Sequence, residues 1–363
     1  MKVGILGGGQ LGRMLALEGF PLGLDFVFLE PKEDPSVAGL GDLVQGEYDD
    51  REALQRLAEQ VDVITFEFEN IPVATARYLQ ELGLEVHPTP RALEMAQDRL
   101  AEKEGFLELE IPVAAFRPVE TRQELDDAVE ALGMPAVLKT RFGGYDGKGQ
   151  VVIGDGGEVA AAWNELGGEF LILEQFVDFQ RELSIVAARD RSGNLRAYPL
   201  VENGHRGGIL RTTVAPAPDV SDDLQGRATG YLRSLMDHLG YVGVVALELF
   251  EVDGRLLANE MAPRVHNSGH WSLDGAVHSQ FENHLRAVCG FPLGDTSPRG
   301  HSTMVNLLGR VPDTADLLEI PGAHLHLYDK DPRPLRKLGH VTVTGSSRDV
   351  VREGAEVLRR LVE

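Results

Sequence analysis

The first part of the chain, to about residue 95, alternates apolar blocks with amphipathic ones. Short, almost wholly apolar runs stand at "VGIL", "FVFLE", "VDVITFE" and "LEVHP". Between them, "QLGRMLALEG", "REALQRLAEQ" and "PVATARYLQELG" place apolar residues at helical spacing. Apolar strands that alternate with helices are typical of a parallel sheet covered by helices. Residues 1–96 are therefore predicted to form a small Rossmann-like α/β domain.

The pattern changes after this point. "TPRALEMAQDRLAEKEGFLEL" predicts one long amphipathic helix, and "TRQELDDAVEAL" predicts another. Strands are predicted at "PAVLKT", "VVIG", "FLILEQFV", "RELSIVAARD", "LRAYPLVEN" and "VVALELFEVDGRLLANEMAP", the last with a hairpin turn at Asp253–Gly254. Residues 97–292 are thus predicted to form an α+β domain. Residues 293–363 are expected to form a small β-rich cap that ends in a helix.

Composition limits the function. The 363 residues carry 35 Lys and Arg against 57 Asp and Glu, a formal net charge of -22. Such a surface repels nucleic acids and anionic membranes, so neither is an expected partner. The single cysteine, Cys289, excludes an internal disulfide and is interpreted as a small buried apolar residue. No signal peptide or membrane-spanning stretch is visible, so a cytoplasmic location is expected.

The first predicted strand leads into Gly7, Gly9 and Gly12, which are spaced G-x-G-x-x-G. The second strand ends at Glu30, so the pair has the fingerprint of a dinucleotide site. On its own this fingerprint suggests an oxidoreductase, which would have no use for the polar motifs further along the chain.

A glycine-rich loop, "KTRFGGYDGKGQ", connects two predicted strands of the middle domain. Its glycines and its cations, Lys139 and Lys148, are suited to closing over phosphate groups. The spacing is not that of a Walker motif, and a flexible surface hairpin is the structural alternative.

Glu248 and Glu260 lie in two apolar strands that the Asp253–Gly254 turn connects. Two carboxylates on neighbouring strands suit Mg²⁺ bound together with substrate phosphates. A two-residue turn would pair Glu248 with Asn259 and turn Glu260 to the other face. One extra residue, in the turn or as a bulge, would bring both glutamates to one face. A pair of salt-bridged structural residues is the alternative.

Three further segments concentrate polar residues. "MAPRVHNSGHWS" follows Glu260 and is suited to bind an anion or a substrate, with an ordinary loop as the alternative. "YDKDPRPLRKLGH" is strongly basic for this acidic chain and suits a phosphate, with a solvated charged turn as the alternative. "TFEFENIP" places Glu67 and Glu69 at the carboxyl end of a predicted parallel strand, where open α/β sheets bind ligands, with helix capping as the alternative.

Six segments, in order along the whole chain, resemble the 5-(carboxyamino)imidazole ribonucleotide synthases, which are ATP-grasp ligases of purine biosynthesis. They are "GGGQLGRM", "TFEFENIP", "GGYDGKGQ", "EQFV" with "RELS", "NEMAPRVHNSGHWS" and "RKLGH". The resemblance implies a pre-ATP-grasp domain (1–96), an ATP-grasp domain (97–292) and a cap (293–363). It also implies a homodimer that uses ATP, Mg²⁺ and bicarbonate to carboxylate the amino group of aminoimidazole ribonucleotide through carboxyphosphate.

The resemblance also implies roles for individual residues. ATP is expected to contact Arg99, Lys139, Gly144, Tyr145, Asp146, Gly147, Lys148, Gly149, Gln150, the adenine-reading backbone of Glu174, Gln175, Phe176 and Val177, and Glu182, His205 and Asn259. Mg²⁺ is expected on Glu248 and Glu260. The ribonucleotide is expected to contact Gln10, Glu67, Tyr145, Asp146, Arg264, His266, Asn267, Ser268 and His270, with its phosphate on Lys330, Arg336 and Lys337. Asp146 is the expected proton acceptor, and Arg264 and His270 are expected to hold the carboxylated intermediate.

In this setting the first glycines border the ribonucleotide pocket, Gly12 is interpreted as a helix–strand packing residue, and Glu30 becomes a structural residue. Three alternatives remain open. The first is another ATP-grasp ligase, such as a formate-dependent glycinamide ribonucleotide transformylase. The others are a dinucleotide-dependent oxidoreductase and a nucleotide-binding regulator without turnover.

Overall fold

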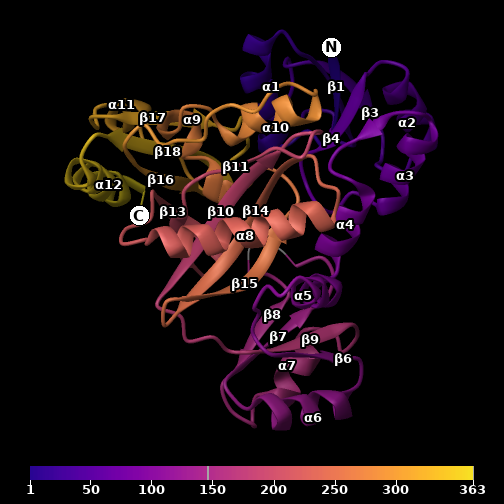
Figure 1. The fold of residues 1–363 in the computed structure, drawn as a ribbon, viewed down its shortest axis with the longest axis vertical. Coiled ribbons are helices and arrows are strands. Elements are labelled where there is room, and N and C mark those ends of the chain that lie inside the picture. Colours follow the sequence, from indigo (N-terminus) through magenta and orange to yellow (C-terminus); the bar gives the residue numbers. More distant parts are fainter. Residues whose placement is uncertain (145–146, 363) are drawn as a thin grey trace.

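A computed structural model describes residues 1–144 and 147–362, so that Tyr145, Asp146 and Glu363 lie outside the described part. The first domain is a parallel sheet in the order β3-β2-β1-β4-β5 with helices packed against it, as predicted (Figure 1). Its elements are β1 (Lys2–Leu6), α1 (Gln10–Gly19), the short 3-10 helix η1 (Phe20–Leu22), β2 (Asp25–Glu30), β3 (Asp42–Gln45), α2 (Arg51–Ala58), β4 (Val63–Phe66), α3 (Val73–Glu81) and β5 (Glu85–Val86). Strand β3 was not predicted, because only Val44 of its four residues is buried and no apolar run marks it.

The single long helix predicted after this domain is wrong. The structure has two helices, α4 (Pro90–Gln97) and α5 (Arg99–Glu108), with Asp98 between them in an extended conformation. The Asp98 carboxylate accepts a hydrogen bond from the N–H of Leu100 (3.0 Å), which caps α5. It also accepts two hydrogen bonds from the Arg141 guanidinium (3.0 and 2.6 Å). This break places Arg99 at the first turn of α5.

A small lobe follows and projects away from the rest of the molecule at the bottom of Figure 1. Its antiparallel sheet has the order β6-β9-β7-β8. The lobe consists of β6 (Phe116–Val119), α6 (Arg122–Leu132), β7 (Ala136–Thr140), β8 (Gln150–Ile153), α7 (Val159–Glu165) and β9 (Leu171–Gln175). The glycine-rich loop connects β7 to β8, as the sequence predicts.

The remaining strands form one large, predominantly antiparallel sheet in the order β15-β14-β10-β12-β13-β16-β18-β17, and β11 pairs with β10. Its strands are β10 (Arg181–Arg189), β11 (Leu195–Ala197), β12 (Val201–Arg206), β13 (Ile209–Ala215), β14 (Gly243–Val252), β15 (Arg255–Ala262), β16 (His301–Leu308), β17 (Ala323–Leu327) and β18 (Lys337–Gly345). The associated helices are α8 (Asp222–His238), the 3-10 helix η2 (Asn267–Gly269), α9 (Ser272–Gly275), α10 (Gln280–Val288), α11 (Thr314–Leu318) and α12 (Arg348–Val362). Helices α7 and α8 and strand β13 were not predicted, and "LRAYPLVEN" divides into β11 and the start of β12.

The cap strands belong to this same sheet, because β13 pairs with β16, for example Thr212 with Val305. The first domain shares a core with the large sheet, in which Leu15 and Phe26 belong to the same buried cluster as Val244 and Trp271. The two domains are therefore joined by continuous packing rather than by a flexible linker. Among the described residues, no helix is both long and apolar enough to cross a membrane.

Replacing Asp98 with alanine is expected to lower the free energy of unfolding by about 1–2 kcal/mol, because α5 loses its cap. Asp98→Asn keeps a capping oxygen and is expected to lose less. Urea unfolding followed by circular dichroism measures both. Equal losses in the two variants would assign the effect to the ion pair with Arg141 instead of the cap.

Candidate active site

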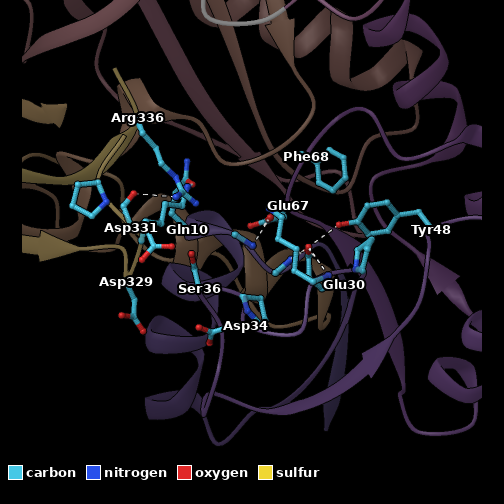
Figure 2. A pocket seen from close by; sticks show the side chains of 17 residues that line it. Gln10, Glu30, Asp34, Ser36, Tyr48, Glu67, Phe68, Asp329, Asp331 and Arg336 are labelled. Atoms are coloured by element: carbon cyan, nitrogen blue, oxygen red, sulfur yellow. Dashed lines mark hydrogen bonds between the residues drawn. The ribbon is translucent and has the colours of Figure 1, made fainter. Parts of the chain in front are cut away.

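The glycine fingerprint lies at the edge of a pocket of about 600 Å³ between the first domain and the cap (Figure 2). Its lining includes the predicted residues Gln10, Glu67, Lys330 and Arg336. It also includes residues that the sequence analysis did not single out: Lys32, Asp34, Ser36, Tyr48, Phe68, Asp329 and Asp331. Several of these follow β2 at the carboxyl edge of the sheet, which is the signal that could have identified them.

Glu67 occupies the space that the glycines leave. Its carboxyl oxygens accept hydrogen bonds from the N–H groups of Gly9 (2.5 Å) and Gly12 (2.8 Å). A Cβ on Gly7 would lie 2.2 Å from the Glu67 Cγ, and one on Gly9 would lie 2.4 Å from its Oε1. Burial raises the pKa of Glu67, while the two N–H groups oppose that shift. The start of α1 therefore binds a carboxyl group of the chain itself, where a dinucleotide would place its pyrophosphate.

Gly12 and Glu30 both have contacts beyond the roles expected from the sequence. The interpretation of Gly12 as a packing residue alone is wrong, since its N–H donates to Glu67. Glu30 accepts hydrogen bonds from the Gly8 N–H (2.9 Å) and the Tyr48 hydroxyl (2.8 Å), so it does hold structure, but it also lines the pocket.

The cap contributes cations to the pocket. Lys330 donates a hydrogen bond to the Gln10 side chain, and Arg336 lies on the same side (Figure 2). Burial lowers the pKa of Lys330 to about 8, with Glu67 opposing the shift and Arg336 adding to it. Lys337 begins β18 and does not line this pocket.

A second cluster lies where the small lobe meets the large sheet, around the two strands predicted to carry the metal ligands. Val252 pairs with Arg255 across the turn, but the register shifts further along and Glu248 pairs directly with Glu260. The extra residue in β15 is Asn259, so the bulge alternative is confirmed. Burial and the nearby Glu260 raise the pKa of Glu248 to about 7.

Cations face this carboxylate pair. Arg99 donates to Glu260 (2.8 Å), and Lys139 lies 3.0 Å from the Glu174 carboxylate. Burial alone would raise the pKa of Glu174, but Lys139 and Lys103 outweigh it and hold the pKa at about 2. Lys103 lies 3.2 Å from Glu174 and was not predicted, because a lysine in an amphipathic helix gives no signal of its burial.

The described part of the glycine-rich loop lies beside this cluster. A Cβ on Gly144 would lie 2.9 Å from an Arg99 nitrogen, and one on Gly147 would lie 2.8 Å from the Gly208 Cα in the turn between β12 and β13. Gln150, at the end of the loop, pairs with Lys139. Lys148 and Gly149 lie in the same loop, and the expected roles of Tyr145 and Asp146 fall outside the described residues.

The segment expected to read adenine begins in the last two residues of β9 and continues past its end. The N–H groups of Gln175 and Phe176 donate to the carbonyls of Ala115 (2.8 Å) and Pro135 (3.3 Å). These two N–H groups are therefore already bonded within the protein, and adenine reading by the other backbone groups of the segment stays a prediction. The pair expected near the ribose is close together, with Nδ1 of His205 2.5 Å from the Glu182 carboxylate.

The loop after β15 connects the two sites. Arg264 forms an ion pair with Glu69 of the first domain. His266 lies 3.4 Å from Glu248 through Nε2 and 2.9 Å from the Ser268 hydroxyl through Nδ1. Burial and the nearby Arg264 lower the pKa of His266 to about 3, so the imidazole is neutral.

The rest of this loop points into the protein. Asn267 exchanges hydrogen bonds with Asn306 (3.1 and 2.7 Å), and Ser268 is completely buried. His270 is 1% exposed and contacts Gln280 (3.1 Å). The structure thus brings Arg264 and His266 to the carboxylate cluster, while these three side chains form the support behind them.

The carboxylate pair suits Mg²⁺. In the described part of the chain, no group of three or more His, Cys, Asp or Glu residues could hold a metal. The Oδ1 of Asn259, next to Glu260, is buried without a hydrogen-bond partner. Two carboxylates and a spare amide oxygen match an ion that takes few protein ligands and completes its shell with phosphates and water.

Three family models match successive parts of the chain. Residues 1–97 match the ribonucleotide synthetase preATP-grasp domain, residues 104–281 the ATP-grasp domain, and residues 302–354 the phosphoribosylaminoimidazole carboxylase C-terminal domain. The chain is 48% identical to the N5-carboxyaminoimidazole ribonucleotide synthase of Pseudomonas aeruginosa over 363 residues, which is 100% of both chains.

Solved structures are similarly close. The N5-carboxyaminoimidazole ribonucleotide synthetase of Thermus thermophilus has a TM-score of 0.96 and 52% identity, covering 99% of this chain and 98% of that one. The Aspergillus clavatus N5-carboxyaminoimidazole synthase, solved with ADP and 5-aminoimidazole ribonucleotide, has a TM-score of 0.92 and 30% identity, covering 99% and 98%.

The fold and the paired glutamates facing a lysine and an arginine define an ATP-grasp ligase, which confirms the predicted fold class. Within that class, the chain belongs to the N5-carboxyaminoimidazole ribonucleotide synthase family. The resemblance inferred from the sequence is thereby confirmed.

Replacing Gly9 with alanine is expected to displace Glu67 and to destabilise the protein by about 1–3 kcal/mol, because a buried carboxyl group loses its donors. Ribonucleotide affinity should fall with it, while ADP affinity should not change. Gly230→Ala is a matched control, since this glycine lies in α8 with nothing within 4 Å of the added Cβ. Calorimetric titration and thermal unfolding measure both; a Gly9→Ala protein with unchanged ribonucleotide affinity would contradict the expectation.

Proposed function

We propose that this protein uses ATP and bicarbonate to carboxylate the amino group of 5-aminoimidazole ribonucleotide, forming the N-carboxylated ribonucleotide, ADP and phosphate in purine biosynthesis. The observation that carries the proposal is the direct pairing of Glu248 with Glu260, together with the His266 contact to Glu248. This contact joins the carboxylate pair to the loop after β15, which would face the ribonucleotide. The names of the relatives support the same reaction.

ATP would lie between the small lobe and the large sheet. Arg99, Lys139 and the described loop residues Gly144 and 147–150 would face its phosphates, and Glu182 with His205 would face its ribose. Glu248, Glu260 and the Asn259 amide oxygen would hold Mg²⁺. Mg²⁺, when bound, supplies positive charge that offsets the charge on the transferred phosphoryl group.

The reaction then needs two transfers. A bicarbonate oxygen attacks the γ-phosphorus of ATP, the bond to the β-phosphate oxygen breaks, and ADP leaves with carboxyphosphate formed. The amino group of the ribonucleotide next takes up the carboxyl carbon, phosphate leaves, and one amine proton must be accepted. We propose Asp146 for this proton, on the resemblance alone, since that residue lies outside the described part.

The chain's own residues would orient these steps. Arg264, held by Glu69, and the neutral His266 would lie at the carboxyl group that is transferred. The direct role expected for His270 stays a prediction, and its burial behind the loop favours support of Arg264 and His266. Carboxyphosphate reacts with water, so the glycine-rich loop would exclude solvent before it forms.

The ribonucleotide would occupy the pocket beside the glycines. Gln10 and Glu67 would face its body, and Lys330 and Arg336 its 5′-phosphate, with Ser36 nearby. Lys337 lies outside this lining, so its expected phosphate contact stays a prediction. On the resemblance we also propose a cytoplasmic homodimer, and on the charge of -22 a protein without nucleic-acid or membrane partners.

The test is ADP release in the presence of aminoimidazole ribonucleotide. Release is expected with bicarbonate and not with formate, and Glu260→Gln is expected to lower kcat about 100-fold or more by removing a metal carboxylate. Glu251→Gln, on the same hairpin and outside the cluster, is the control. Formate-dependent release would favour a transformylase, and absence of any turnover would favour the regulator.

Ribonucleotide affinity is expected to depend on pH through Lys330. A bound phosphate stabilises the charged lysine. The affinity for the ribonucleotide is therefore highest below the Lys330 pKa of about 8, and it falls as the pH rises above that value. We expect about a tenfold loss between about pH 8 and 9.5, where the phosphate is already fully charged.

Lys330→Arg keeps its charge across this range and should give a flat profile. Calorimetric titration of the ribonucleotide measures both proteins. A wild-type affinity that is constant up to about pH 9.5 would show that Lys330 does not bind the phosphate.

A further inference from the structure

Strand β15 lies at the edge of the large sheet, and side chains of α5 bond to its backbone groups at and beside the bulge. Lys103 donates from Nζ to the carbonyls of Asn259 (2.8 Å) and Ala258 (3.5 Å). Glu102 accepts a hydrogen bond from the N–H of Met261 (2.6 Å). These bonds fall on the extra residue and on residues on either side of it.

The same helix face contacts the carboxylate cluster. Arg99, Glu102 and Lys103 are spaced i, i+3 and i+4, so they share one side of α5. Arg99 donates to Glu260, and Lys103 also lies 3.2 Å from the Glu174 carboxylate, which in turn holds Lys139. One helix face thus joins the bulge in the large sheet to the lysine of the small lobe.

The chemistry of the cluster implies a specific arrangement. Lys103 is 1% exposed and Glu102 is 2% exposed, so neither reaches a substrate. Burying a lysine and a glutamate is unfavourable unless both are paired and hydrogen-bonded. An apolar helix face could pack against β15 as well, but it would leave the carbonyl of the inserted Asn259 unsatisfied, which disfavours the bulge.

We propose that Lys103 and Glu102 are positioning residues, which hold the β15 bulge and thereby keep Glu248 and Glu260 on one face to bind the nucleotide-bound Mg²⁺. The inference rests on the proposed function, because it needs those glutamates to be the metal ligands. In a regular hairpin Glu248 would face Asn259, and the metal site would have a single carboxylate.

Equilibrium binding of ADP, measured by calorimetric titration with and without Mg²⁺, tests this inference. In Lys103→Met the affinity of the ADP complex for Mg²⁺ is expected to fall about 10- to 100-fold, as for other residues that orient metal ligands. The affinity for aminoimidazole ribonucleotide should not change, because its pocket is elsewhere. Lys103→Arg retains a donor and a charge and should restore part of the Mg²⁺ effect.

Glu102 gives an independent pair of variants, should Lys103→Met not fold. Glu102→Gln keeps an oxygen that can accept from Met261 and is expected to bind Mg²⁺-ADP nearly as the wild type does. Glu102→Ala removes the acceptor and is expected to lose the Mg²⁺ effect. Arg189→Met is the matched control. Arg189 also donates to a backbone carbonyl, that of Tyr241 (2.7 Å), but it lies at the carboxyl end of β10, outside the carboxylate cluster.

The outcomes separate this inference from the proposed function. If wild-type ADP binding does not respond to Mg²⁺, the proposed metal site is wrong. If wild-type binding responds and Lys103→Met and Glu102→Ala respond equally well, the positioning role is wrong. A lower melting temperature with an unchanged Mg²⁺ effect would likewise leave these residues a structural role only.

Discussion

One extra residue in an edge strand of the large sheet places the two glutamates of the proposed metal site on one face. Side chains alternate along a strand, so Glu248 and Glu260 can share a face only because Asn259 is inserted between the regular pairs. That insertion would be unfavourable without partners for its backbone groups, which α5 provides. The break before α5 at Asp98 matters for the same reason, since it places Arg99 beside Glu260. A cap, a bulge and a carboxylate pair thus depend on one another.

The glycine motif illustrates a different constraint. A strand that ends in glycines before a helix presents free N–H groups, and these groups bind any suitably placed acceptor. Here the acceptor is Glu67, which a neighbouring strand supplies, and its carboxyl group approaches too closely for any side chain at Gly7 or Gly9. The motif therefore has the physics of an anion site without a dinucleotide ligand. A carboxyl group of the chain itself binds these N–H groups, and the pocket lies beside it.

The sequence predicted elements and residue types well where the signal is local. The strands and helices of the first domain, except β3, follow from apolar runs, and the glycine loop and the basic cap segment follow from composition. Features that depend on contacts between residues far apart in the sequence could not be predicted in this way. The burial of Lys103 depends on β15, more than 150 residues away, and the shared sheet depends on β13 pairing with β16. The helix break at Asp98 was not predicted either, because its partner Arg141 lies 43 residues further along the chain. The Asp253–Gly254 turn left two registers open for Glu260, and the bulge at Asn259 decides between them.

The single continuous sheet explains how the two proposed sites can serve one reaction. An acyl phosphate that reacts with water must be used close to where it forms. The carboxylate cluster and the ribonucleotide pocket therefore need to lie at a fixed distance from each other. The β13–β16 pairing joins the cap, which carries Lys330, to the strands that carry Glu248 and Glu260. Arg264 extends from the end of β15 to Glu69 of the first domain. Sheet pairing and this ion pair therefore constrain the distance between the sites from two directions.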